Sequence, residues 1–291
     1  MESPQPPTES PDSSDVPRES PRTILVQFVL FPLGVVLVGV AVFLLFGVLA
    51  SEDHSIPEYV QEIRSGSSHG RWQAAYQLSK SLKRGEAKKY PDLSQDIAAI
   101  YVNARDDDPK IRRYLSMVLG TLGDKRSTSV LIDGLQDPDP ETKIYALWAL
   151  GEIKDPRAVD AISAQAGSPE ADIRKTAVYA LGQIGDARAI PVLVTALNDQ
   201  TPDVRWNAAL SLARLGDSRA LGPVREMLDR KRLDAIPAFR EDQKEDVMIS
   251  AMSAYAKLAG AEARAEIDSI ARSDRSLRVR GAAKEVLTQL P

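Results

Sequence analysis

A spacing of 31 residues between like side chains constrains this chain more than any other feature of its sequence. Four sets of residues keep the spacing in phase: glycines completed by one alanine, leucines, aspartates and arginines. Their members are Gly120, Gly151, Gly182 and Ala213; Leu119, Leu150, Leu181 and Leu212; Asp124, Asp155, Asp186 and Asp217; and Arg126, Arg157, Arg188 and Arg219. Self-similarity at a fixed period of this length is typical of proteins whose repeats stack into an array.

Each repeat is predicted to contain two helices. In residues 170–198, Ile173, Leu181 and Ile184 belong to an apolar stripe at helical spacing, which predicts the first helix. Asp186 is expected to cap the second helix. First helices elsewhere in the array are predicted to begin at a capping oxygen followed by proline. These pairs are Asp108-Pro109, Asp139-Pro140 and Thr201-Pro202.

The end of the first helix is predicted to turn through a left-handed residue. Gly123, Gly185 and Gly216 stand at this position, where glycine has no steric cost. Lys154 replaces glycine in the remaining repeat, so its turn is expected to form less comfortably.

One such unit cannot bury both of its apolar stripes, so neighbouring repeats must stack on each other. We therefore predict an all-α chain whose residues 57–291 form an α-solenoid. The segment LGQIGDARAIPVL, with DIRKTAVYAL upstream, resembles the HEAT-like repeat of the phycobilisome-lyase type. The resemblance is best over residues 106–229. Steps of 41 and 43 residues beyond it predict insertions near residues 83–92 and 230–242.

Families with this repeat include bilin lyases and deoxyhypusine hydroxylases, so the resemblance raises two possible activities. A di-iron hydroxylase site needs His-Glu pairs on several repeats. The chain has only His54 and His69, which are followed by Ser55 and Gly70. A di-iron activity is therefore disfavoured, whereas no motif excludes a role like that of a bilin lyase.

Composition excludes further classes of function. The chain has no cysteine, hence no thiol nucleophile or zinc–thiolate site. Its net charge of -4 argues against a nucleic-acid partner. We expect no catalytic, cofactor-binding or metal-binding residues. The aspartate and arginine sets, and the set Arg112, Lys143, Arg174 and Arg205, are interpreted as caps and inter-repeat pairs, with a ligand-binding ladder as the alternative.

The N-terminal region is predicted to hold a disordered tail, a membrane span and a linker. Residues 1–23 are rich in proline and serine and acidic, which favours disorder. Residues 24–50 carry no charge and would form a helix of about 40 Å, long enough to cross a bilayer. A cleaved signal peptide is the alternative, but its apolar region is normally shorter. Residues 51–56 are expected to link this span to the solenoid.

Orientation is predicted from the charges beside the span. Arg18 and Arg22 precede it and Glu52 and Asp53 follow it. The positive-inside rule then places the N-terminus in the cytoplasm and the solenoid outside the cytoplasm, as a single-pass membrane protein.

Bulky side chains recur on the outer face of the first helices, where this repeat type usually has charged residues. They are Trp72, Tyr76, Met117, Ile144, Trp148, Tyr179, Trp206 and Leu210. Either the insertions and the winding of the solenoid cover them, or they form a contact surface for a protein partner. The predicted function is a membrane-anchored scaffold or adaptor without catalysis of its own. The alternative is an enzyme, or enzyme subunit, of the bilin-lyase kind.

Overall fold

The computed structural model describes residues 25–26, 30–50, 55–82, 89–237 and 239–290. The predicted disordered tail, residues 51–54 of the predicted linker and residues 83–88 of the first predicted insertion lie outside these ranges. The chain divides into two compact units, and the boundary between them along the sequence falls after residue 54.

The unit before residue 55 contains one long helix, α2 (Phe31–Ala50). Among the residues that the structure describes, no helix combines the length and apolarity needed to cross a membrane. The structure thus gives no support to the predicted span over residues 24–50.

In the second unit, all regular secondary structure of the described residues is helical. It begins with α3 (Ile56–Ser65). The longer, first helices of the successive repeats are α4 (Ser68–Ser81), α6 (Pro109–Leu122), α8 (Pro140–Ile153), α10 (Ala171–Ile184), α12 (Pro202–Arg214), α15 (Glu241–Ala259) and α17 (Leu277–Gln289). The second helices are α5 (Leu93–Asn103), α7 (Thr128–Gly134), α9 (Val159–Gln165), α11 (Ile190–Ala196), α13 (Leu221–Glu226) and α16 (Arg264–Ser273).

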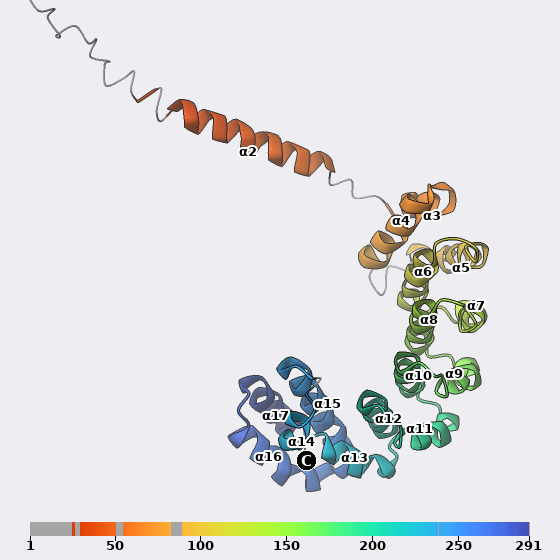
Figure 1. Ribbon diagram of the computed structural model, residues 1–291, viewed down its shortest axis with the longest axis vertical. Helices are drawn as coiled ribbons and strands as arrows, with labels where there is room; N and C mark the ends of the chain where they lie inside the picture. Colours follow the sequence, from red (N-terminus) through yellow and green to blue (C-terminus); the bar gives the residue numbers. More distant parts are fainter. Residues whose placement is uncertain (1–24, 27–29, 51–54, 83–88, 238, 291) are drawn as a thin grey trace, which may run out of the picture. The chain divides into compact units, whose positions relative to one another are not determined.

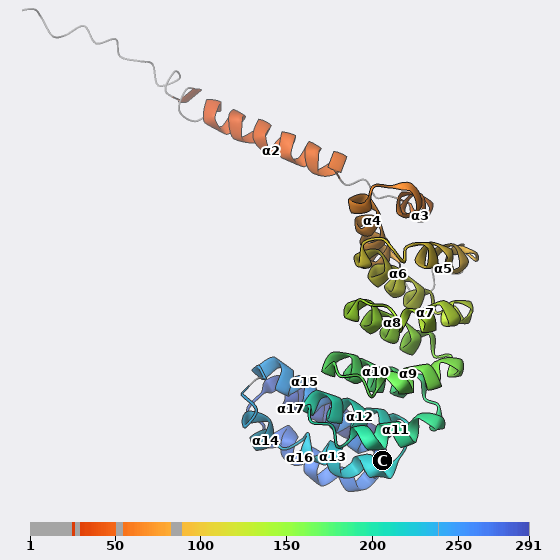
Figure 2. The same cartoon turned by 45° about the vertical axis from the view of Figure 1, so that its right-hand side comes forward.

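Short 3-10 turns lead into five of the second helices, and a short α-helix lies in the second predicted insertion. The turns are η3 (Lys125–Ser127), η4 (Pro156–Ala158), η5 (Ala187–Ala189), η6 (Ser218–Ala220) and η7 (Gly260–Ala263), and the helix is α14 (Arg230–Asp234). Within this unit α4, α6, α8 and α10 follow one side of a curved array, and α5, α7, α9 and α11 follow the other (Figures 1 and 2). The predicted α-solenoid is confirmed.

The core runs along the solenoid between the two layers of helices. Leu119, Leu150, Leu181 and Leu212 are fully buried, as the 31-residue spacing predicts. Each first helix packs against the next: α6 on α8, α8 on α10 and α10 on α12. Neighbour-to-neighbour packing of this kind is how repeats without a closed core of their own become stable.

The helix ends agree with the predicted turn chemistry at most positions. The side chains of Asp108 and Asp139 accept hydrogen bonds from the backbone N–H groups of Lys110 and Thr142. Thr201 occupies the corresponding position before α12, but its side chain makes no capping hydrogen bond.

The residues that follow the first helices confirm the predicted left-handed turns. Gly123, Gly185 and Gly216 have φ of 68°, 76° and 75°. Lys154 is forced into the same conformation at φ 56°, the one non-glycine residue with positive φ in the described part. A side chain in this region is sterically disfavoured, because its Cβ crowds the carbonyl oxygen.

The first helices approach most closely at the glycine positions. A methyl group on Gly120 would lie 2.8 Å from Cα of Ala149, one on Gly151 3.0 Å from Cα of Ala180, and one on Gly182 2.8 Å from Cα of Ser211. Real Cβ atoms essentially never come as close as 2.8 Å, and a contact of 3.0 Å is tighter than nine in ten of theirs. The glycines therefore set the spacing between repeats.

Replacing Gly182 by alanine is expected to destabilise the fold by about 1–3 kcal/mol, because the added methyl group separates α10 from α12. Gly281 is the matched control, since it lies inside α17 with open space around its Cα. Gly281→Ala should stabilise by up to about 1 kcal/mol through helix propensity alone. Urea unfolding of the full-length chain measures both changes, and equal effects would contradict the close-approach role of Gly182.

Candidate functional site

A groove on the surface of four consecutive first helices is the best-formed candidate site. It encloses about 630 Å³ between α6, α8, α10 and α12. Its lining residues are Met117, Ile144, Tyr145, Trp148, Lys175, Thr176, Tyr179 and Asn207. An apolar groove with a few polar groups at its margin is the usual form of a binding site.

The structure divides the eight predicted contact residues into three groups. All of them are half-buried. Met117, Ile144, Trp148 and Tyr179 line the groove. Trp72 and Tyr76 belong to an aromatic cluster on its N-terminal side, while Trp206 and Leu210 lie on α12 and pack against the core. The eight side chains therefore form a row along the first helices, but only four of them shape one concave surface.

The aromatic cluster continues the groove toward α4. Trp72 and Tyr76 have their ring centroids 6.3 and 5.0 Å from that of Tyr114, which in turn lies 6.5 Å from the ring of Tyr145. Such distances are typical of favourable offset or edge-to-face contacts. The rings thus connect α4, α6 and α8, and hold the aromatic residues of this row in fixed positions.

Sequence reasoning missed one set of groove residues. Tyr145, Thr176 and Asn207 keep the 31-residue step and lie between the two columns from which the candidates were chosen. Tyr114 starts the same set on α6. The signal was present, because Tyr145 and Thr176 stand three residues before Trp148 and Tyr179, and on a helix residues i and i+3 share a face.

Cations lie over three rings of this row. Lys80 Nζ is 4.8 Å from the ring centroid of Tyr76, and Lys110 Nζ is 4.9 Å from that of Trp72. The guanidinium of Arg214 is 5.6 Å from the ring centroid of Tyr179. These cation–π contacts place positive charge at both margins of the apolar surface.

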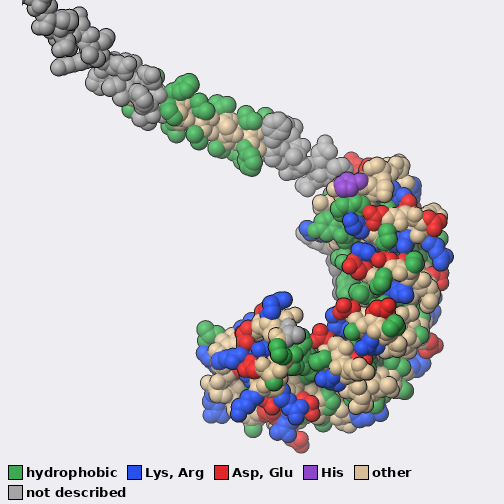
Figure 3. All heavy atoms as spheres, viewed as in Figure 1, with side chains coloured by type: hydrophobic (Ala, Val, Ile, Leu, Met, Phe, Trp, Pro, Cys, Tyr) green, Lys and Arg blue, Asp and Glu red, His purple; other side chains and the backbone are tan. Residues whose placement is uncertain are grey.

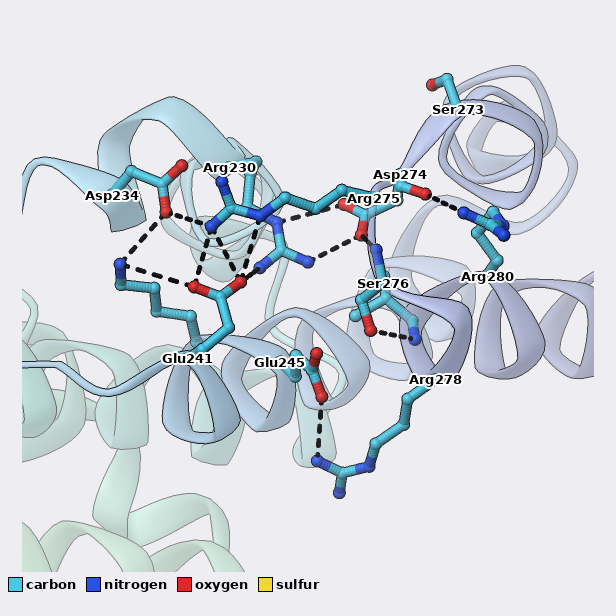
Figure 4. Close-up of polar contacts among 12 residues, drawn as sticks. Arg230, Asp234, Glu241, Glu245, Ser273, Asp274, Arg275, Ser276, Arg278 and Arg280 are labelled. Atoms are coloured by element: carbon cyan, nitrogen blue, oxygen red, sulfur yellow. Dashed lines mark hydrogen bonds and ion pairs between the residues drawn. The ribbon is translucent and has the colours of Figure 1, made fainter.

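The second predicted insertion covers the C-terminal end of the row. Phe239 lies on Trp206 with ring centroids 5.1 Å apart and the ring planes at 31°. An ionic cluster holds this insertion against the last repeat (Figure 4). In it, Arg230 pairs with Asp274 and Glu241, both at 2.7 Å, and Arg275 pairs with Glu241 at 2.8 Å.

The aspartate and arginine sets act as helix caps and as pairs between repeats, which is the first of the two interpretations given from the sequence. The carboxylates of Asp124, Asp155, Asp186 and Asp217 each accept a hydrogen bond from the backbone N–H two residues later and from the arginine there. Three of these arginines, Arg126, Arg157 and Arg188, also reach the preceding repeat. Arg157 donates to the carbonyl oxygen of Lys125, and Arg188 to that of Pro156, both at 2.7 Å.

The set that includes Arg112 also fastens repeats together. Arg112 is 3% exposed and pairs with Asp137 at 2.6 Å, and it donates to the carbonyl oxygens of Ala104 and Arg105. Arg174 pairs with Asp199 at 2.7 Å. Arg205 Nη1 donates to the carbonyl oxygens of Asp199 and Gln200. Buried guanidinium groups that are bonded on all sides are part of the framework.

Residues able to hold a metal ion do not gather anywhere in the described part of the chain. His69 lies in the first turn of α4, where its ring meets Trp72 edge-on at 5.3 Å. Lys175, the one strongly basic group of the groove, is paired with Asp172 at 2.6 Å. The groove thus offers apolar contact and hydrogen bonding.

Asp155 couples the stability of the array to pH. Its carboxylate is 2% exposed, and hydrogen bonds from the Arg157 side chain, the Arg157 backbone N–H and the Thr128 hydroxyl lower its pKa to about 2. Since the unfolded pKa is higher, at 3.8, the stabilisation is complete above pH 4 and is lost as pH falls from about 4 to 2.

Asp155→Asn is therefore expected to lower the free energy of unfolding at pH 7 by about 2 kcal/mol and to reduce the loss of stability between pH 4 and 2. Asp186→Asn is the matched control, because Asp186 has the same bonds to Arg188 but a more exposed carboxylate. Urea unfolding followed by circular dichroism from pH 7 to 2 measures both. An Asp155 variant with the acid sensitivity of the wild type would refute the assignment.

Comparison with known proteins places the fold in a known class. Residues 97–174 and 160–238 match the family model of HEAT repeats. The complex of CpcE and CpcF of phycocyanin lyase from Nostoc sp. PCC7120 is similar at a TM-score of 0.55 and 21% identity, covering 83% of this chain and 97% of that chain. Computationally designed armadillo repeat proteins for modular peptide recognition match at a TM-score of 0.43 and 17% identity, over 69% and 100% of the two chains. No curated protein matches the sequence.

Proposed function

We propose that this chain, whose residues 97–174 and 160–238 match the model of HEAT repeats, acts as a scaffold or adaptor whose groove docks a protein partner. One observation carries the proposal: Met117, Ile144, Trp148 and Tyr179 come from three repeats and line one apolar groove. Aromatic side chains held in place by neighbours lose little entropy on binding, so they are suited to anchor an interface.

We also propose that the chain has no catalytic activity of its own. The groove contains neither a carboxylate nor a histidine, and its lysine is already paired with Asp172. General acid–base or nucleophilic catalysis needs such groups within hydrogen-bonding reach of a substrate. Mixed charges of both signs cover the visible face of the solenoid, which supports a partner other than nucleic acid (Figure 3).

A role as a bilin-lyase-like enzyme or enzyme subunit is the second candidate. The fold that the chain shares with the CpcE–CpcF complex favours it. A likeness at 21% identity extends to the fold, and function depends on the residues of a site. Co-purification of a bilin chromophore with this chain would favour the second candidate over the first.

Docking is tested with variants of Met117 and Tyr179. All three of Met117, Trp148 and Tyr179 are half-buried in the groove, but of these only Trp148 packs against the core. Met117→Glu combined with Tyr179→Glu should abolish co-purification of the partner that the full-length wild type retains. The melting temperature should stay within a few degrees, because surface substitutions usually change stability by about 0.5 kcal/mol or less.

Leu181→Ala is the contrasting variant. Leu181 is fully buried on α10, so the change should destabilise the fold by about 2–5 kcal/mol through lost burial and a cavity. If the double glutamate variant unfolds as readily as the Leu181 variant, the two groove residues are structural and the docking surface is refuted.

We propose further that residues 24–50 anchor the chain in a membrane, with the N-terminus in the cytoplasm and the solenoid outside it. The support is in the sequence: an uncharged run of 27 residues, preceded by Arg18 and Arg22 and followed by acids. Helix α2 has no charged residue in its first or last turn.

The topology predicts that a reporter enzyme active only outside the cytoplasm, fused after Pro291, is active in intact cells. Positively charged flanks are retained on the cytoplasmic side, which leaves the C-terminus on the other. Activity of a cytoplasm-only reporter at the same position would reverse the orientation, and recovery of the fusion without membranes would refute the anchor.

A further inference from the structure

We infer that the groove binds an extended acidic segment of a partner protein, and that an aromatic side chain of this segment enters between Trp148 and Tyr179. The inference rests on the proposed docking function and specifies the chemistry of the partner. Three observations carry it: an internal occupant of the same row, unpaired cations at the margins of the groove, and the length of the groove.

The internal occupant is Phe239. Residues 235–237, 239 and 240 are not helical, and from this stretch the phenyl ring lies on Trp206. Trp206 keeps the 31-residue step with Ile144 and Lys175, two lining residues of the groove. The molecule itself therefore shows that this row of positions accepts an aromatic ring from a non-helical segment, in which the Phe239 N–H donates to the carbonyl oxygen of Ile236.

The equivalent surface of the two preceding repeats has no such cover among the described residues. Ile144 and Trp148 on α8 and Tyr179 on α10 face the open groove. An aromatic ring there would remove apolar surface of all three side chains from water and gain ring–ring contact. The surface of Ile144, Trp148 and Tyr179, in the two repeats before the ring pair of Trp206 and Phe239, is therefore suited to bind an aromatic ring of a partner protein.

Unpaired cations of the solenoid indicate which side chains flank the aromatic residue in the bound segment of the partner. On the two outer helices of the groove, Lys110 of α6 and Arg214 of α12 lie over aromatic rings and have no acidic partner among the described residues. By contrast, Glu141 pairs with Arg113, and Asp172 pairs with Lys175.

Among the acids of the four groove helices, Asp203 lies in the first turn of α12, at the opposite end from Arg214. Glu152 has a partner of its own. The two cations left over favour carboxylates on either side of the bound ring, because complementary charges steer a partner and fix its register.

The groove crosses four helices, which sets the length of the segment. Neighbouring helix axes lie about 8–10 Å apart, so three steps span about 27 Å. An extended chain rises about 3.4 Å per residue, which makes the bound segment about eight residues long.

The test uses a fluorescein-labelled peptide of about eight residues with one central phenylalanine and glutamates on both sides. Binding to the full-length chain in mild detergent is followed by fluorescence anisotropy. Two further peptides, one with alanine for phenylalanine and one with lysines for the glutamates, are each expected to bind about tenfold more weakly or worse.

Variants of the chain locate the site. Tyr179→Ala should weaken binding about tenfold, and Lys110→Gln with Arg214→Gln by about threefold or more, with the larger effect at low salt. Lys143→Gln is the matched control, because Lys143 lies on α8 of the same array but, unlike Lys110 and Arg214, over none of the described rings of this row; it should leave binding unchanged.

The outcomes separate this inference from the docking function itself. Equal binding of the lysine peptide, or of the alanine peptide, overturns the acidic aromatic partner. Peptide binding that Tyr179→Ala leaves unchanged also overturns this inference. The inference is likewise overturned if no peptide binds while the glutamate variants at 117 and 179 still lose the natural partner. If those glutamate variants keep the partner, the docking function has failed instead.

Discussion

The close packing of each first helix against the next is the contact on which the rest of the solenoid depends. It exists because Gly120, Gly151 and Gly182 leave no Cβ in the way of the neighbouring backbone. No repeat has a closed core of its own, so every repeat depends for its stability on contact with its neighbours. A fixed spacing between helices also fixes the spacing between the side chains that they display.

The polar sets reinforce this contact from the turns that follow the first helices. The arginine of each Asp-x-Arg turn bonds to its own aspartate. In three repeats it also bonds to a carbonyl oxygen of the preceding repeat, 32 or 35 residues earlier in the chain. Thr128 reaches Asp155 across the same boundary at 2.8 Å. Charged groups that are satisfied in this way contribute geometry as much as free energy, since they fix how each repeat is turned on the last.

The sequence predicted the period, the caps and the left-handed turns, because these depend on residues close together in the chain. Lys154 illustrates this, as its place in the repeat alone placed it in a glycine conformation. The sequence did not predict which of the eight bulky residues share a surface. Trp206 is covered by Phe239, which comes from an insertion of irregular structure, and no periodicity predicts where such a segment lies.

The extent of the groove follows from the extent of the regular repeat. The 31-residue step is unbroken from α6 to α12, and these four helices supply all lining residues of the groove. On the N-terminal side the step lengthens, and rings of α4 and α6 pack on one another. On the C-terminal side an insertion lays Phe239 over the row and is held there by the ionic cluster of Arg230 and Arg275. A regular ladder of first helices therefore provides the open surface, and the two irregular segments limit its length.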